Sequence, residues 1–321
     1  MKLKIPYRIN IAGAYLDCIN DPVITATINK YLTFNYTKRD DNIIIVDSKE
    51  FPGLCIIDLS PHRHEGNHWS EYVNGCIFAF IRNNFKLQYG CNIEVLNDLP
   101  SGIGISSSAA FIVGIIKCIA AVNNLDLSND LVASLGYYVE HEYLNIPCGR
   151  MDFKAVLHEP GIWKVETNDC SFSSDYLISA KHYTGLLLYK EQHEHLTDER
   201  FVNIVRDIKD AKENFRQNLK AAYIDYEKAI IACIVYEAQD GKLDESYLGM
   251  FLTNTYVNII ANIFDEREKL NEIANKPEGV YGGKLLGSGL KGARFLLINK
   301  EYKDKIIDMY KNEYQIMECE I

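Results

Sequence analysis

Residues 99–110, LPSGIGISSSAA, decide the fold of this chain. They follow residues 91–96, where apolar and polar side chains alternate as in a half-buried strand, and they lead into the apolar stretch 107–122, which predicts a buried helix. Gly102 and Gly104 permit a tight backbone bend, and the serines that follow place hydroxyl and amide donors at the helix start, where an anion is favoured. On its own, the segment is equally consistent with a phosphate-binding turn and with a serine-capped helix after a glycine turn.

This turn differs from the two commonest glycine-rich nucleotide motifs. The chain contains no G-x-x-x-x-G-K-[ST] sequence, which excludes a P-loop. The third glycine of a dinucleotide fingerprint is also absent, because serine and alanine stand there. Any phosphate binding here must therefore belong to another class of site.

The composition is that of a globular protein without nucleic-acid or membrane partners. The chain has 321 residues, of which 47% are hydrophobic and 24% charged, and this length suggests two domains. Its 34 Lys and Arg against 44 Asp and Glu leave a net charge of −10, which repels phosphate backbones and anionic lipids. The longest apolar stretch, 109–122, is interrupted by Lys117 and is too short to span a bilayer. We expect small-molecule partners, no nucleic acid and no membrane.

Cysteine and histidine usage points to a cytoplasmic protein without a structural metal. Nine cysteines are scattered without any C-x-x-C pair, which is typical of reduced thiols, and the first residues lack a secretory signal. His62, His64 and His68 form a cluster without fixed ligand spacing, which favours a polar loop over a metal site.

The periodicity predicts an α+β protein in two lobes. Strands are expected at 43–46, 54–59, 91–96, 184–189 and 293–298, with further strands between residues 7 and 32. Helices are expected at 72–83, 107–122, 131–144, 198–236, 247–275 and 302–310. The character of the sequence changes past residue 161, and we place an N-terminal ATP-binding lobe at 1–172 and a C-terminal lobe at 173–321.

Three ordered blocks resemble the motifs of the GHMP kinases, the family of galactokinases and of homoserine, mevalonate and phosphomevalonate kinases. Residues 100–109 match the second family motif, P-x-x-x-G-L-S-S-S-A, with Ile105 in place of leucine. Residues 6–18, PYRINIAGAYLDC, resemble the first motif, and residues 283–292, GKLLGSGLKG, resemble the third. The blocks span nearly the whole chain.

Within that family the resemblance is to sugar kinases. Residues 139–143, 147–152 and 69–75 are similar to galactokinase segments. Residues 26–31 and 281–287 look more like heptose 7-phosphate kinases. The resemblance implies a two-lobed fold whose N-terminal lobe resembles the second domain of ribosomal protein S5 and whose C-terminal lobe is ferredoxin-like.

The function that the resemblance implies is transfer of the γ-phosphoryl group of ATP, with Mg²⁺, to a monosaccharide hydroxyl, favouring the anomeric one. Two alternatives stay open: a kinase of a phosphorylated heptose or acidic sugar, and a catalytically silent sugar-binding regulator on the same scaffold. The oligomeric state, monomer or homodimer, is also open.

The family motifs assign the catalytic and metal-binding residues. Asp152 matches the aspartate that takes the proton of the acceptor hydroxyl, and Arg8 matches the arginine that keeps it ionised. Ser108 and Glu140 match the two protein ligands of Mg²⁺. The alternative for Asp152 is a helix or turn cap.

Nucleotide binding is assigned to the two glycine-rich segments and an aromatic pair. Ser106 and Ser107 are expected to bond phosphate oxygens. Trp69 and Tyr72 are candidates to flank the adenine, although aromatic residues at this spacing are more often part of a core. The complete nucleotide-binding set is Pro100, Gly102, Gly104, Ser106, Ser107, Ser108, Trp69, Tyr72, Gly287 and Gly289.

The substrate-binding candidates are Asp17, Tyr15, Gly149 and Arg150. Asp17 matches the galactokinase aspartate that holds sugar hydroxyls. Tyr15 stands where galactokinases have histidine, and the residue before it is alanine instead of their glutamate, so galactose itself is in question. Arg150 and Lys154 flank the acceptor site and suit a phosphate or carboxylate on the sugar, or are exposed charges at a helix start.

Overall fold

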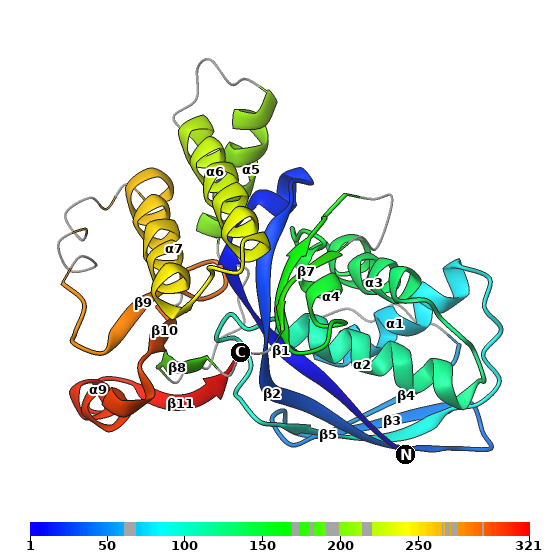
Figure 1. Ribbon diagram of the computed structural model, residues 1–321. Coiled ribbons are helices and arrows are strands. Elements are labelled where there is room, and N and C mark those ends of the chain that lie inside the picture. Colours follow the sequence, from blue (N-terminus) through cyan, green and yellow to red (C-terminus); the bar gives the residue numbers. More distant parts are fainter. Residues whose placement is uncertain are drawn as a thin grey trace. The chain divides into compact units, whose positions relative to one another are not determined.

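The protein is described here by a computed structural model, in which the chain divides into two compact units (Figure 1). The first comprises residues 1–7, 30–101 and 106–158, and the second residues 8–29, 102–105 and 159–321. The structure describes residues 1–60, 69–168, 174–179, 183–190, 199–213, 220–264, 266, 270, 275–290 and 292–321. His62, His64 and His68 lie outside these ranges, and so does the predicted lobe boundary at 172/173, which stays a prediction.

The first unit is built on a mixed sheet. Its strands are β3 (Ile43–Ser48), β4 (Leu54–Asp58) and β5 (Cys91–Asn97), joined by the C-terminal part of β2 (Val23–Lys38), in the order β4-β3-β5-β2. β3 runs parallel to β5, and β2 runs antiparallel to it, with Phe34 opposite Val95. The odd-numbered residues of β5 from Cys91 to Val95 are buried, as the alternation in the sequence predicts.

Helices cover one side of this sheet. They are α1 (Ser70–Arg82), α2 (Ser107–Val122), α3 (Asn129–Tyr137) and α4 (Met151–Ala155). α2 has the predicted bounds and lies directly on the sheet, because a Cβ at Gly114 would be 2.0 Å from the Phe34 ring. The predicted helix 131–144 instead starts at the Ser128 cap and ends in a π-helical turn, Tyr138–Tyr143.

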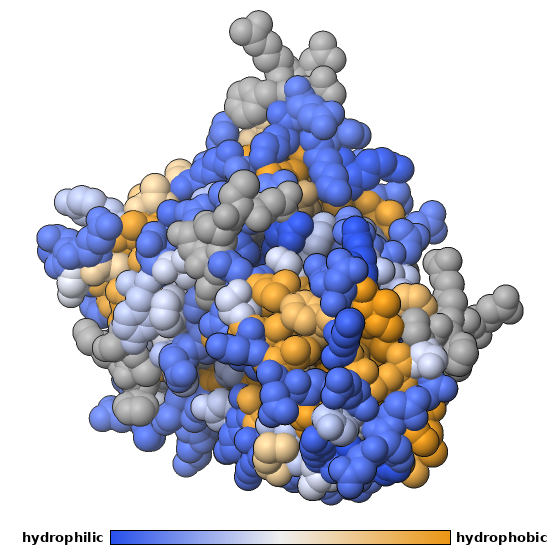
Figure 2. All heavy atoms as spheres, turned by 90° about the vertical axis from the view of Figure 1, so that its right-hand side faces the viewer, coloured by the Kyte–Doolittle hydropathy of each residue, from blue (hydrophilic) through white to orange (hydrophobic). Residues whose placement is uncertain are grey.

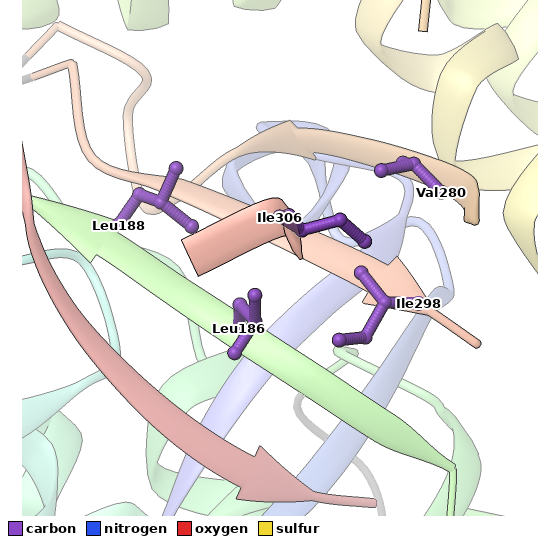
Figure 3. Packing of buried hydrophobic residues seen from close by; sticks show 5 residues of the cluster. All are labelled: Leu186, Leu188, Val280, Ile298 and Ile306. Carbon is purple, nitrogen blue, oxygen red and sulfur yellow. The ribbon is translucent and has the colours of Figure 1, made fainter. Parts of the chain in front are cut away.

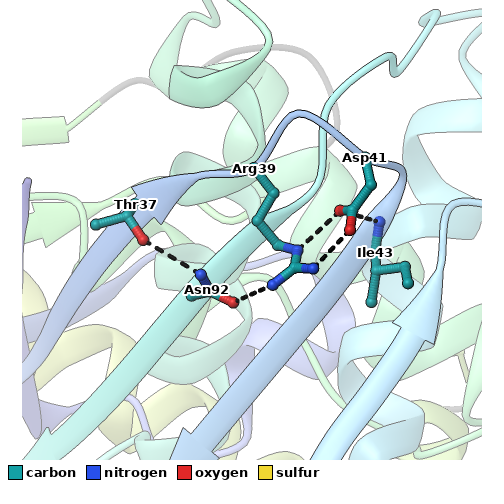
Figure 4. A network of polar contacts seen from close by, with 5 residues as sticks. All are labelled: Thr37, Arg39, Asp41, Ile43 and Asn92. Carbon is teal, nitrogen blue, oxygen red and sulfur yellow. Dashed lines mark hydrogen bonds and ion pairs between the residues drawn. The ribbon is translucent and has the colours of Figure 1, made fainter.

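The other side of the sheet carries solvent-facing groups. Leu54 and Ile56 of the edge strand β4 are 58% and 61% exposed, and Figure 2 shows apolar side chains at the molecular surface. Arg39 forms an ion pair with Asp41 at 2.5 Å, and its guanidinium also donates to Asn92 at 2.8 Å (Figure 4). The hydrogen bond from Arg39 lowers the pKa of Asp41 to about 2.

The second unit contains a four-stranded antiparallel sheet. Its strands are β8 (Thr184–Tyr189), β9 (Val280–Leu285), β10 (Arg294–Ile298) and β11 (Gln315–Glu320), in the order β11-β8-β10-β9. After a 3₁₀ turn, Lys300–Tyr302, helix α9 (Lys303–Tyr310) packs on this sheet. The apolar cluster between them is shown in Figure 3 and consists of Leu186, Leu188, Val280, Ile298 and Ile306.

The second unit also contains the C-terminal end of β1 (Lys2–Ala12) and the start of β2. β6 (Gly161–Val165) pairs with the start of β2 and with β7 (Ser174–Ser179). The helices are a 3₁₀ turn (Leu16–Ile19), α5 (Glu199–Glu213), α6 (Lys220–Gln239) and α7 (Glu245–Asn258), which continues into a π-helical turn (Ile259–Ile263).

α5 packs on α6, α6 on α7, and α7 on β9. α7 and β9 approach each other closely at Gly282, where a Cβ would overlap the carbonyl of Gly249. In the part of the chain that the structure describes, no helix combines the length and the apolar character needed to cross a membrane.

Candidate active site

The serines at the start of α2 leave two buried hydroxyls unsatisfied. Ser106 precedes the helix with φ 64°, a left-handed conformation that is uncommon outside glycine, and it is 6% exposed. The Oγ atoms of Ser106 and Ser107 are buried and have no hydrogen-bond partner among the described residues. A buried hydroxyl without a partner is costly, and the first turn of a 16-residue helix attracts an anion. The turn therefore offers hydroxyl donors and a helix N-terminus to an anion.

The two glycine-rich segments meet in the second unit. Gly104 has φ +86° and Gly287 has φ +58°, and a Cβ at Gly104 would lie 2.6 Å from the backbone nitrogen of Gly287. Gly102 and Gly289 also have positive φ. Because neither Gly104 nor Gly287 has a side chain, their backbones can approach each other closely. Gly104 precedes the first of the serines, Ser106, by two residues.

Arg8 fixes the shape of this glycine turn. Its backbone N–H donates to the Ile105 carbonyl at 3.2 Å, and its guanidinium donates to the Gly104 carbonyl at 3.1 Å. The side chain is only 3% exposed. Arg8 and Asp152 belong to different units, and the role of Arg8 toward Asp152 stays a prediction.

Glu140 lies in the first unit on the π-helical turn and is 6% exposed. Burial raises the pKa of Tyr72, and the charge of Glu140 raises it further. α1, which carries Tyr72, packs against both α2 and the π-helical turn. Ser108 and Glu140 are therefore held on elements that share a neighbour, and they offer the oxygen ligands that Mg²⁺ prefers.

No group of three or more His, Cys, Asp or Glu side chains within the described ranges is arranged to hold a metal ion. A magnesium that keeps several waters and binds phosphate oxygens does not need such a group.

Asp152 lies on α4, which packs against α2 and α3. Gly136 of α3 makes room for the neighbouring Phe153, because a Cβ there would be 2.6 Å from its ring. Just before α4, the Arg150 guanidinium stacks on the ring of Tyr137 at 3.9 Å from its centroid. Gly149 precedes Arg150 in the same loop.

Lys154 is 5% exposed, so the alternative that it is an exposed charge at a helix start is wrong. Burial lowers the pKa of His158 to about 4, and the charge of Lys154 contributes to the shift. A buried cation thus follows Asp152 by two residues.

Trp69 sits in an aromatic cluster at the start of α1. It stacks on Phe51 with ring centroids 5.8 Å apart and meets Phe111 of α2 edge-on at 6.4 Å. Pro100 is exposed at the end of the loop after β5. The cluster supports the helix that bears the serines, and the adenine-binding role of Trp69 and Tyr72 stays a prediction.

The two predicted sugar-binding residues of the first motif lie on a tightly held turn of the second unit. Asp17 is 7% exposed within the 3₁₀ turn. Tyr15 is 5% exposed, has φ 68°, and donates its hydroxyl to the Ser288 carbonyl at 2.5 Å. That bond links this turn to the loop of the third motif.

Three further polar residues support these loops and were missed by sequence reasoning. Glu50 accepts hydrogen bonds from the backbone N–H of Ser101 at 2.5 Å and from its hydroxyl at 2.6 Å. Lys284 donates to the Asn10 side chain at 2.7 Å, and burial lowers the pKa of Lys284 to about 7. Glu227 accepts from the Gly13 N–H at 2.6 Å. Only Lys284 had a local signal, since it lies inside the third motif.

The predicted site residues fall into two groups. The first unit holds Trp69, Tyr72, Pro100, Ser106, Ser107, Ser108, Glu140, Gly149, Arg150 and Asp152. The second unit holds Arg8, Tyr15, Asp17, Gly102, Gly104, Gly287 and Gly289.

Known proteins resemble this chain in sequence over nearly its whole length. Residues 71–159 match the family described as GHMP kinases N terminal domain. The chain is 24% identical to a galactokinase of Pyrococcus furiosus, covering 97% of this chain and 93% of the relative. It is 25% identical to a D-glycero-alpha-D-manno-heptose 7-phosphate kinase of Campylobacter jejuni, covering 98% and 94%.

Solved structures share the fold. Lactococcus lactis galactokinase, complexed with galactose, matches with a TM-score of 0.85 at 18% identity, covering 100% of this chain and 93% of that structure. Methanococcus jannaschii mevalonate kinase matches with a TM-score of 0.74 at 17% identity, covering 100% and 98%. The resemblance inferred from the three motifs is confirmed: residues 71–159 match the N-terminal domain of the GHMP kinases, and the chain adopts the GHMP kinase fold.

Proposed function

We propose that this protein is a sugar kinase that transfers the γ-phosphoryl group of ATP to a monosaccharide hydroxyl, the anomeric one being favoured. The observation that carries the proposal is the pair of buried hydroxyls of Ser106 and Ser107 at the first turn of α2, for which the described part of the chain provides no hydrogen-bond partner. Phosphate oxygens would accept from both, and the helix dipole would favour their charge. The galactokinase and heptose phosphate kinase relatives support a sugar as the acceptor.

Asp152 would act on the acceptor. Its carboxylate accepts the proton of the sugar hydroxyl as the hydroxyl oxygen bonds to the γ-phosphorus, and the bond from that phosphorus to the bridging oxygen of ADP breaks. An ordinary carboxylate is a weak base toward an alcohol, which suits a loose transition state in which the proton leaves late. Most of the catalysis would then come from positioning and from charge neutralisation.

Ser108 and Glu140 would hold Mg²⁺, whose charge offsets that of the phosphate oxygens. Ser106 and Ser107 would orient the same phosphates from the helix start. The glycine turn before these serines would be kept in shape for the phosphates by Arg8 and by its contact with the Gly287 backbone.

A second candidate acceptor is a sugar that already carries a phosphate or carboxylate. The observation that favours it is that Arg150 and the buried Lys154 stand two residues on either side of Asp152, so that the acceptor segment carries two cationic side chains. The similarity to a heptose 7-phosphate kinase supports the same class.

The test is an ADP-release assay with Mg-ATP over a panel of neutral, acidic and phosphorylated monosaccharides. We expect turnover with at least one sugar of the panel. Turnover of a neutral sugar supports the first acceptor class, and turnover of an acidic or phosphorylated sugar supports the second. Measurable sugar binding in a thermal-shift assay without any turnover would instead indicate a sugar-binding regulator.

A further inference from the structure

The segment Gly13–Asp17 adopts a backbone that needs outside support. Gly13 has φ +81°, and Tyr15 follows with φ 68°, which is costly for a bulky side chain. Such a conformation persists only where its surroundings hold it. The segment matters because it carries Tyr15 and Asp17, the candidate sugar-binding residues.

One face of α6 supplies this support. Glu227 accepts a hydrogen bond from the Gly13 N–H at 2.6 Å, and the Tyr223 hydroxyl donates to the Ala14 carbonyl. Both side chains have 0% exposure. Because residues four apart lie on the same face of a helix, α6 binds two peptide groups of the segment at once, the one that precedes Gly13 and the one that follows Ala14.

The Glu227 carboxylate is surrounded by donors. Besides Gly13, the Asn258 side chain of α7 donates to it at 2.8 Å, and the Thr255 hydroxyl lies at 3.5 Å. Burial raises the pKa of Glu227, and the charge of Lys284, which donates to Asn10 of β1, opposes this shift. In Glu227→Gln, the side chain would have one acceptor oxygen instead of two. Since Gly13 and Asn258 donate to different oxygens of Glu227, one of these two buried N–H groups would lose its acceptor.

The segment has a second attachment. The Tyr15 hydroxyl donates to the Ser288 carbonyl at 2.5 Å, and the Tyr15 ring lies 6.0 Å from the ring of Phe201 on α5. With its hydroxyl engaged in this way, Tyr15 connects the segment to the third glycine-rich loop. Its orientation therefore depends on a backbone that Glu227 and Tyr223 fix.

We propose that Glu227 is a positioning residue: its carboxylate, held by Asn258, anchors the backbone of Gly13 and thereby fixes Asp17 for the acceptor sugar and Tyr15 for the third glycine-rich loop. The effect of Glu227 on sugar binding rests on the proposed kinase function. The anchoring of the Gly13 backbone by Glu227 does not depend on that function.

The first experiment measures anchoring without any substrate. Hydrogen–deuterium exchange is compared for the wild-type chain, Glu227→Gln and the control Asp225→Asn, which removes a carboxylate from the exposed side of the same helix. We expect faster exchange in peptides covering residues 12–22 in Glu227→Gln only. Unchanged exchange there, or an equal increase in every peptide, would overturn the proposal.

The second experiment measures the consequence for catalysis. With D-galactose or heptose 7-phosphate, whichever the wild-type chain phosphorylates, we expect Glu227→Gln to raise the KM for the sugar about tenfold. The KM for ATP should change less than twofold, because the third glycine-rich loop is also held by the contact of the Gly287 backbone with Gly104. Equal changes in both constants would overturn the positioning role. If the wild-type chain phosphorylates neither compound nor any other sugar of the panel, the proposed function fails, and the exchange experiment still decides the anchoring.

A double variant supplies the rescue. In Glu227→Gln with Asn258→Asp, the new amide can donate to the aspartate and turn its oxygen back to the Gly13 N–H. We expect protection of residues 12–22 and the sugar KM to return toward wild-type values. A double variant that is worse than Glu227→Gln in both readouts would contradict the proposed hydrogen-bond pattern.

Discussion

Two buried polar regions of this protein differ in how their hydrogen bonds are completed. At the start of α2, the hydroxyls of Ser106 and Ser107 are buried without partners among the described residues. Around α6, both oxygens of Glu227 accept hydrogen bonds from the protein itself. A buried polar atom that the chain leaves open is suited to a ligand, whereas a fully satisfied one maintains the structure. The following changes test this distinction.

The largest effect is expected at Asp152, whose helix α4 packs against the serine-bearing helix α2. Asp152→Asn removes the proton acceptor and keeps the shape of the side chain, so we expect kcat to fall by about three orders of magnitude or more. The KM for ATP should change little. Steady-state kinetics with the sugar identified by the panel measures both. A kcat equal to that of the wild type would remove Asp152 from its assigned role.

The open hydroxyls should affect ATP more than stability. In Ser107→Ala, a buried donor without a partner is removed, so we expect the melting temperature of the free protein to stay the same or rise. The KM for ATP should rise about fivefold to tenfold because a charge-assisted hydrogen bond is lost. Thermal unfolding with and without ATP separates the two effects. A marked loss of stability in the free protein would contradict the distinction between the two regions.

The buried polar region around Glu227, to which Lys284 belongs, should make the stability of the protein depend on pH. Burial lowers the pKa of Lys284 from 10.5 to about 7, so between these values the unfolded chain binds a proton that the folded chain does not. The contribution of Lys284 to stability is therefore lost as pH falls from about 10 to 7. In Lys284→Gln, the melting temperature should rise less between pH 7 and 9.5 than in the wild type. Parallel pH profiles for the two proteins would exclude the shift.

The smallest effect is expected at the exposed network of Figure 4. Arg39 and Asp41 face solvent, where water screens their attraction. We expect Arg39→Gln to leave both the melting temperature near neutral pH and the kinetic constants unchanged. A marked fall in the melting temperature, or a change in the kinetic constants, would show that the contrast between buried and exposed networks does not hold in this protein.

Local patterns in the sequence predicted some elements well and others poorly. Helix 107–122 and strand 184–189 have the predicted bounds, because each is an apolar segment whose burial follows directly from its composition. Strands β6, β7, β9 and β11 were not predicted, because they lack such a continuous apolar segment and take their form from pairing with other strands. The π-helical turn at 138–143 was also missed, since apolar periodicity does not distinguish it from an α-helix.

For the candidate site, the order of glycines and serines in residues 99–110 predicted a bend followed by a helix start, which the structure has, because such a turn is determined by nearby residues. That this turn binds phosphate stays a prediction. The tertiary structure alone brings Glu227 to Gly13, 214 positions away, and Tyr15 to Ser288, 273 positions away. The reason is physical: periodicity reports which face of an element is buried, whereas a buried hydrogen bond depends on which distant donor the folded chain places against that face.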